Sequence, residues 1–172
     1  LSRNMDVEQI VDTICNGNPP RQEVKFTIIE GMSVEDIAEK LVSVGLLSDT
    51  KTFLDLCKGG GDFEYTFLTG IEPNPDQARD YLLEGYLFPD TYEVYADASE
   101  KAIVNRMLYR FFEIFSDQYI TRAQELGMSI DEVVRLASLI EKEARTDEDF
   151  PKVSAVFHNR LAKEMRLQSD AP

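Results

Sequence analysis

The sequence contains few of the residues that bind metals. Two cysteines, Cys15 and Cys57, and one histidine, His158, occur among its 172 residues. No metal-ligand spacing can be built from so small a set, so no metal site is expected. His158 is assigned to structure or to solvent. The two cysteines leave two interpretations open, a single disulfide in an oxidising compartment or two buried free thiols, and the second is favoured.

Long apolar runs are also lacking. No stretch is long enough to cross a bilayer, and no signal peptide is recognisable. The chain begins and ends in the middle of a pattern, at LSRNMDVEQI and at QSDAP. We therefore expect a soluble piece of a longer protein.

Basic residues are scarce compared with acidic ones. Lys and Arg number 18 against 32 Asp and Glu, which gives a formal net charge of -14. Such a surface repels phosphate backbones and anionic lipid headgroups, so nucleic acid is not an expected partner. The hydrophobic content of 43% suffices for one medium domain or two small ones.

The first half predicts a compact strand–helix–helix unit. Residues 5–16 form a short helical pattern that stops at a Gly and two Pro. The β-branched run 24–29 predicts a strand. Ser33 and Asp36 resemble a capping box that opens an amphipathic helix, and a further helix is expected over 51–57.

A linker-like composition marks a boundary, and helical patterns follow it. Gly, Pro and Asp concentrate between residues 59 and 80. Ser99 is expected to cap one later helix, the Ser129–Glu132 capping box opens another, and Pro151 begins a third. The predicted division is a leading tail over 1–23, a small module over 24–68, a linker over 69–80 and a main domain over 81–172.

One carboxylate falls on an apolar face. In the helix that contains LASLIEKEAR, Glu141 lies seven residues after Val134, which returns it to within about 20° of that side chain. Burial of a carboxyl group raises its pKa and would leave it protonated and able to act as an acid. The alternative is that Glu141 emerges into solvent at the end of the stripe, and helical geometry alone favours that alternative.

Four phrases, taken together, resemble a known family. LEGYLFPDTY at 83–92, ASLIEKEA at 137–144, VSAVFHNRL at 153–161 and MRLQSD at 165–170 occur in the order and spacing of the YceG-like, MltG-type endolytic murein transglycosylases. The similarity extends from about Val24 to Asp170. In that family the first glutamate of the IEKE phrase is catalytic, and it corresponds to Glu141.

The resemblance implies an architecture and a location. It implies an α+β fold in which a small LysM-like βααβ module precedes a mainly helical catalytic domain with short β elements. The parent protein would be anchored by one N-terminal transmembrane helix and would act at the outer face of the cytoplasmic membrane. Its partners would be peptidoglycan glycan strands, with cell-wall synthesis machinery as a further candidate.

The implied reaction needs one carboxylic acid. A lytic transglycosylase lets the muramic 6-hydroxyl attack the anomeric carbon, so Glu141 can first donate and then accept a proton. Sugar subsites need aromatic faces and hydrogen-bonding groups. Candidates for these roles are Glu84, Tyr86, Phe88, Asp90, Tyr92, Asn159, Arg160, Gln168 and Asp170.

Simpler interpretations stand beside these assignments. The aromatic rings suit core packing equally well, and Arg160 suits an ion pair with Asp90 or Glu143. Two other functions remain open: a non-catalytic glycan-binding module, and a hydrolase that pairs Glu141 with Glu84 or Asp90. No cofactor is expected, because nothing around Lys142 or Lys152 suggests the phosphate-cradling loop of a pyridoxal-phosphate lyase.

Overall fold

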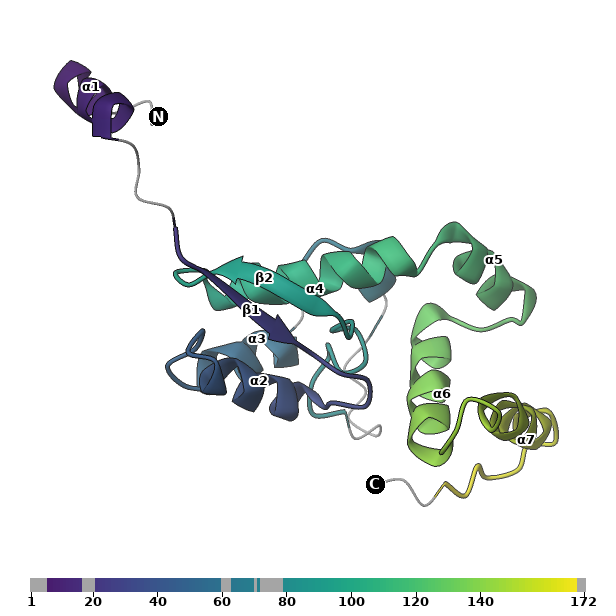
Figure 1. Cartoon of the computed structure of the whole chain (residues 1–172). Coiled ribbons are helices and arrows are strands. Elements are labelled where there is room, and N and C mark those ends of the chain that lie inside the picture. Colours follow the sequence, from purple (N-terminus) through teal and green to yellow (C-terminus); the bar gives the residue numbers. More distant parts are fainter. Residues whose placement is uncertain (1–5, 17–20, 60–62, 70, 72–78, 170–172) are drawn as a thin grey trace.

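A computed structural model describes residues 6–16, 21–59, 63–69, 71 and 79–169. It combines helices with a small antiparallel sheet, so the predicted α+β class is confirmed. The first helix, α1 (Val7–Asn16), is drawn apart from the other elements (Figure 1). No helix within the described ranges has the length and apolar character needed to cross a membrane.

The sheet joins two segments that are distant in the sequence. β1 (Glu23–Thr27) pairs antiparallel with β2 (Thr91–Tyr95), so that Phe26 lies opposite Tyr92. Both strands alternate, and these two rings point into the core while their neighbours face solvent. β1 lies before and β2 after the predicted 69–80 linker, so the sheet takes one strand from each side of it.

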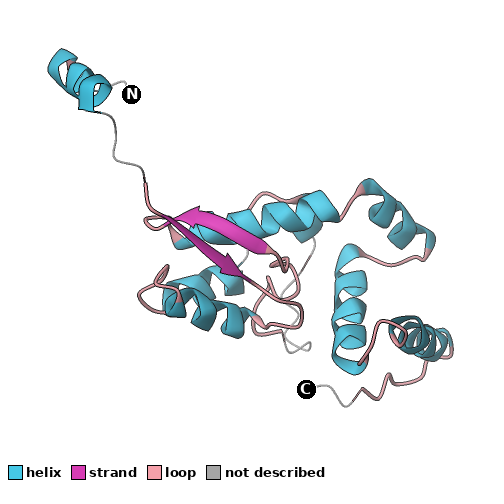
Figure 2. Ribbon diagram, viewed as in Figure 1, coloured by secondary structure: helices cyan, strands magenta, loops and turns pink. Residues whose placement is uncertain are grey.

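Three helices pack with the sheet around the main core. They are α2 (Val34–Ser43), α3 (Lys51–Gly59) and α4 (Glu100–Ile114), and Figure 2 shows them alongside the magenta strands. The capping box of Ser33 and Asp36 is present at the start of α2, as predicted. Each fully buried aliphatic or aromatic side chain in this core contributes roughly 1.5–3 kcal/mol of transfer free energy. The core therefore provides a firm scaffold.

The chain continues from α4 into three further helices. α5 (Asp117–Glu125), α6 (Ile130–Glu143) and α7 (Phe150–Ala162) extend beyond the sheet and its helices (Figure 1). The Ser129–Glu132 capping box opens α6 as predicted, and Pro151 lies in the first turn of α7. A single turn of 3-10 helix, η1 (Thr66–Leu68), precedes the predicted linker, of which residues 70 and 72–78 lie outside the described part.

Three elements were not predicted from the sequence. The strand β2, the helix α5 and the short turn η1 were not recognised individually from their own patterns.

Both cysteines are free thiols. Cys57 is buried, and desolvation raises its pKa to about 12. Cys15 is exposed, so the prediction of a buried thiol is correct for Cys57 and wrong for Cys15.

Candidate functional site

The helix α6, which contains Glu141, packs against the LEGYLFPDTY segment through a glycine. Gly85 has a positive φ of +84°, and a Cβ placed there would lie 2.7 Å from Val134 Cγ1 and 3.5 Å from Ser138 Oγ. A backbone in this conformation and this close to a helix favours glycine strongly. Gly85 therefore sets the closest approach between the segment and α6.

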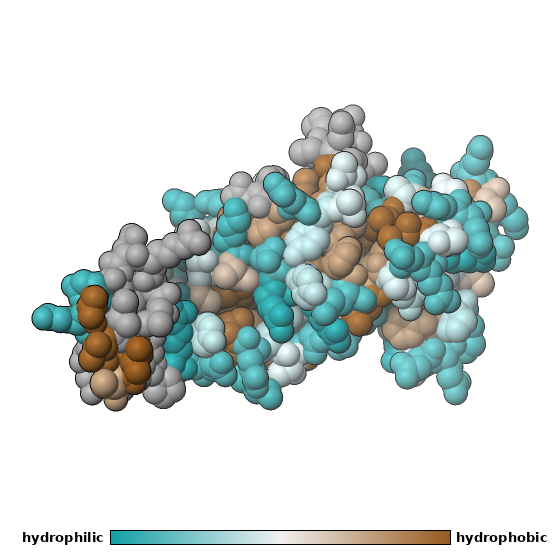
Figure 3. Space-filling model, turned by 90° about the horizontal axis from the view of Figure 1, so that it is seen from above, coloured by the Kyte–Doolittle hydropathy of each residue, from teal (hydrophilic) through white to brown (hydrophobic). Residues whose placement is uncertain are grey.

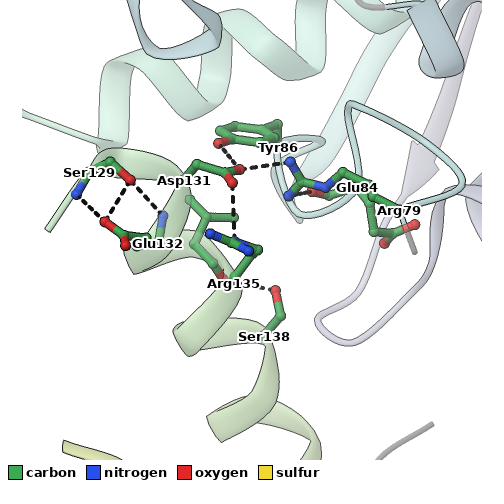
Figure 4. A network of polar contacts seen from close by, with 9 residues as sticks. Arg79, Glu84, Tyr86, Ser129, Asp131, Glu132, Arg135 and Ser138 are labelled. Carbon is green, nitrogen blue, oxygen red and sulfur yellow. Dashed lines mark hydrogen bonds and ion pairs between the residues drawn. The ribbon is translucent and has the colours of Figure 1, made fainter. Parts of the chain in front are cut away.

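A polar network anchors the first turn of α6 (Figure 4). Asp131 Oδ1 accepts hydrogen bonds from Arg79 Nη1 at 2.7 Å and from the Tyr86 hydroxyl at 2.9 Å. Arg135 Nε lies 3.1 Å from Asp131 Oδ2. Burial, and after it the hydrogen bond to Asp131, raises the pKa of Tyr86, so this hydroxyl remains a neutral donor.

The opposite end of α6 is tethered to the turn that follows β1. Lys142 Nζ donates a hydrogen bond to the Gly31 carbonyl at 3.1 Å. The helix is thus contacted at Asp131, at Val134 and at Lys142, which lie along one side over three turns. These contacts orient the helix on the sheet-and-helix scaffold.

Glu141 occupies an exposed position beside the last of these contacts. It shares a face with Val134, but seven residues of helix carry it about 10.5 Å further along the axis. Val134 is buried against Gly85, whereas Glu141 lies beyond this packing. The prediction that core residues bury Glu141 is wrong, because the scaffold that covers the stripe ends before the helix does. The alternative, that the stripe emerges into solvent here, describes the observed geometry.

Glu84 lies at the N-terminus of α2. Its Oε2 accepts the Val34 backbone N–H at 3.1 Å, which satisfies one of the unpaired donors of that helix end. Burial raises the pKa of Glu84, and the hydrogen bond from Val34 opposes that rise. In this structure Glu84 therefore joins the β1–α2 turn to the LEGYLFPDTY segment.

The two tyrosines proposed as sugar platforms are core residues. Tyr86 is 0% exposed and Tyr92 is 4% exposed. The Tyr92 ring lies 5.6 Å from that of Phe26, and its hydroxyl donates to the Phe88 carbonyl at 2.5 Å. The prediction that these two rings stack on a sugar is contradicted by their burial, and the core-packing alternative holds for both. Phe88 is half-buried and packs against the core cluster.

Asp90, the residue immediately before β2 in the sequence, forms an ion pair. Its Oδ2 lies 2.6 Å from Arg110 Nε, and its Oδ1 accepts the Thr91 backbone N–H at 2.7 Å. The backbone hydrogen bond first, and Arg110 second, lowers the pKa of Asp90, so the group is ionised at neutral pH. A hollow of about 170 Å³ opens between Asp90 and α4, and Glu141 does not line it.

The last described segment returns toward the end of α6. The Ser169 hydroxyl and Glu143 Oε1 are 2.5 Å apart, while Asn159 and Gln168 are exposed. Arg160 Nη1 donates to the Leu167 carbonyl, so the predicted ion pairs of Arg160 with Asp90 or Glu143 are replaced by a backbone contact. Asp170 lies outside the described residues.

The structure therefore brings together some predicted residues and separates others. The 165–169 segment contacts the end of α6 at Glu143, two residues along the helix from the exposed Glu141. Asp90 and Tyr92 instead belong to the interface of β2 and α4. The structural roles of Arg79 and Asp131 were missed, because their sequence context was that of a linker and of an acidic first helical turn. No group of three or more His, Cys, Asp or Glu in the described ranges is arranged to hold a metal ion.

The comparisons with known proteins cover the whole chain. It is 29% identical over 187 residues to the endolytic murein transglycosylase of Streptococcus pneumoniae serotype 2 (strain D39) and 28% identical over 179 residues to that of Bacillus subtilis (strain 168). Each match covers 99% of this chain, which spans 33% and 48% of those relatives.

A solved structure and a family model agree with these matches. The crystal structure of a YceG-like protein of Listeria monocytogenes superposes with a TM-score of 0.71 at 28% identity, covering 99% of this chain and 57% of that one. The model of the YceG-like family matches residues 1–172. The chain belongs to the YceG-like family.

Proposed function

We propose that this chain is part of an endolytic murein transglycosylase, and that Glu141 is its catalytic acid and base. The main support is the match of the family model to residues 1–172, together with relatives that carry this activity in their names. Glu141 lies in the ASLIEKEA phrase at an exposed position near the end of α6. A polymeric substrate can reach a carboxyl group in that position.

The reaction proceeds without water. Glu141, as the acid, gives its proton to the oxygen that leaves the anomeric carbon of the muramic residue, and the glycosidic bond breaks. The 6-hydroxyl of the same residue then bonds to that carbon and returns its proton to the Glu141 carboxylate. One chain gains a 1,6-anhydro end, the other a free 4-hydroxyl, and the enzyme is unchanged.

The anchoring of α6 supports this assignment. The helix is held at three positions along its axis, by the Asp131 network, by Gly85 and through Lys142. Its last turn therefore has a defined orientation. Catalytic groups act efficiently when neighbouring contacts position them. A glycan strand laid over this end would exclude water from Glu141, which supplies the dry surroundings that the core does not.

Other residues are proposed to bind the substrate. Asn159, Arg160, Gln168 and Asp170 belong to α7 and the segment after it, which returns to α6 through the contact of Ser169 with Glu143. Glu84 and Asp90 are held by Val34 and Arg110, so their part in binding would use their remaining lone pairs. Tyr86 and Tyr92 contribute by packing beneath these groups.

The order β1, α2, α3, β2 supports a LysM-like module as a glycan-binding unit. In this proposal its second strand comes from 91–95, so the module extends through residues assigned from sequence to the main domain. We further propose that the parent protein is anchored by an N-terminal transmembrane helix. It would act on peptidoglycan at the outer face of the cytoplasmic membrane, beside cell-wall synthesis enzymes.

Digestion of uncrosslinked glycan strands tests the activity. Mass spectrometry of the products should detect 1,6-anhydro ends with the unmodified chain. Glu141→Gln should lower the rate by about 10²–10⁴-fold or more, because the amide cannot transfer the proton. The matched control is Glu148→Gln, a change at another exposed glutamate, which should retain full activity.

The products also separate the alternatives. Reducing ends in place of anhydro ends would identify a two-carboxylate hydrolase and refute the transglycosylase. The exposure of Glu141 favours a second candidate, a non-catalytic glycan-binding module. Binding without cleavage by the unmodified chain would support that module. A Glu141→Gln chain that still binds glycan but no longer cleaves it would instead separate binding from catalysis and support the transglycosylase.

A further inference from the structure

A polar hollow lies between β2 and α4, and Glu141 does not line it. Asp90 and Tyr92, to which the proposed function already gives a part in the substrate site, are among its lining residues. The hollow measures about 170 Å³, and its lining includes Asp90, Arg106, Tyr109, Arg110 and Glu113. Typical pockets for drug-sized ligands measure about 300–1,000 Å³, so this hollow suits a single ring-sized group. No residue of α6 or α7 is among those that line it.

The charges of this hollow cancel. Two guanidinium groups face two carboxylates, and Arg110 bridges the pair, 2.6 Å from Asp90 and 3.3 Å from Glu113. These side chains are between one third and one half exposed, so lone pairs and N–H groups remain open to solvent. Ordered donors and acceptors of this kind can hydrogen-bond a ligand that is rich in hydroxyl and amide groups.

Aromatic rings extend from this hollow across α4. Tyr109, which lines the hollow, is 44% exposed, and its ring lies 6.3 Å from that of Phe112, which is 52% exposed. The Phe112 ring lies 6.2 Å from that of Tyr65. We name these three residues the α4 aromatic strip. Tyr65 is half-buried and stacks on Phe67. The exposed faces of Tyr109 and Phe112 can stabilise a ligand that has an apolar face.

The strip ends at a second, larger hollow. Tyr65 lines this open space of about 490 Å³ together with Phe63, Leu68 and Leu82. The strip therefore connects two hollows by a row of rings. Viewed from above, the molecule carries apolar patches over its central part, separated by hydrophilic side chains, and a further patch on α1 (Figure 3). A linear ligand of repeated rings matches such a row better than a compact one does.

We propose that the α4 aromatic strip and the hollow beside Asp90 form a second saccharide-binding surface, which holds a linear glycan away from Glu141. The inference rests on the proposed function for its choice of ligand, a β-linked amino-sugar strand. Sugar rings stack their C–H faces on Tyr109 and Phe112, while their hydroxyl and acetamido groups bond to the Asp90–Arg110–Glu113 cluster. Such a surface retains the strand during or after a cut.

The test measures binding separately from cleavage. A peptide-free murein octasaccharide is titrated into the Glu141→Gln chain by calorimetry, and the same is done with Tyr109→Ala or Phe112→Ala added. Each added change should raise Kd about fivefold or more, because one stacking contact is lost. Tyr119→Ala is the matched control, since this ring on α5 is 56% exposed and does not line the hollow.

The outcomes distinguish this inference from the proposed activity. Weaker binding with both strip variants, and unchanged binding with Tyr119→Ala, supports the surface even if the unmodified chain never releases anhydro ends. No measurable binding, or equal affinity in all variants, overturns it. An equal loss with Tyr119→Ala also overturns it. Circular dichroism and melting curves check that each variant is folded.

Discussion

The sheet with α2, α3 and α4 differs sharply in packing from the region α5–α7. The first contains most of the buried side chains, including Phe53, Leu83 and Met107 with no exposed area. Among described residues after α4, Val134 is the buried side chain that joins this core, while Ala123, Leu136 and Phe157 are buried outside it.

The two regions therefore have different roles: the first stabilises the fold, and the second exposes the proposed catalytic residue to substrate. The core region is held by apolar burial, whereas α6 is attached to it by a few specific contacts at Asp131, at Gly85 and at Lys142. Regions with few buried contacts open at lower free energy than densely packed ones. A long polymer needs open access, so the proposed catalytic residue belongs to the lightly packed region and depends on the core for orientation.

The largest expected effect is on the core itself. Phe53→Ala should lower the free energy of unfolding by about 3–5 kcal/mol, because it leaves a cavity in fully buried packing. Phe157→Ala should cost less and increase hydrogen exchange mainly in α6 and α7, where that ring is buried. Urea unfolding and hydrogen exchange measure both. If both variants lost the same free energy of unfolding, and hydrogen exchange increased over the whole chain in each, the two regions would not be separate in stability.

The next effect concerns the contact between the two regions. Gly85→Ala should cost about 2–4 kcal/mol, since the left-handed backbone and the 2.7 Å approach to Val134 both oppose a methyl group. Gly127→Ala is the control, with φ of +68° and no neighbour within 4 Å, and should cost about 1–2 kcal/mol. Thermal or urea unfolding gives the two values. If they are equal, the contact with α6 contributes nothing.

A smaller effect is expected from the Asp131 network. Asp131→Asn should cost about 1–3 kcal/mol, because Arg79 loses its charged partner at a side chain that is only 21% exposed. It should also reduce glycan cleavage through misorientation of α6. Glu125→Gln, in the exposed pair with Arg122, should change stability by less than about 0.5 kcal/mol. A cost as small as that of the control would show that the network does not hold α6.

The smallest effect is a pH dependence at Glu84. Burial raises its pKa above the ordinary 4.5, so stability is lost as the pH rises from that value through the raised pKa, and the loss is constant at higher pH. Glu84→Gln should therefore be slightly more stable than the unmodified chain at pH 7, with the difference vanishing toward pH 4.5. Glu39→Gln, at an exposed site on α2, serves as the control. A difference that does not vary with pH would contradict the assignment.

Local signals predicted much of the fold. The two capping boxes, at Ser33 and at Ser129, mark helix starts that involve only residues three apart. β2 was harder to recognise, because its partner β1 lies more than 60 residues earlier and the segment before it is crowded with aromatic residues. α5 was missed because its apolar face is thin, and Ala123 is its buried residue.

The candidate site shows the same limit. The helical wheel correctly put Glu141 in line with Val134, but only packing could tell that Gly85 covers one and not the other. The aromatic density of residues 83–92 suited a sugar site and a core equally well. The structure placed Tyr86 and Tyr92 inside, and left Tyr109 and Phe112 outside on a helix predicted from its apolar spacing.

By itself, the sequence determined the main helices and their caps, the acidic surface, and the phrases by which the chain belongs to its family. These properties depend on residues within a few positions of each other, or on the amino-acid composition of the whole chain. Tertiary structure alone decided which side chains meet water, because burial depends on contacts between segments far apart in sequence. That is why Glu141 is open to solvent, Glu84 is partly buried, and Asp90 faces α4.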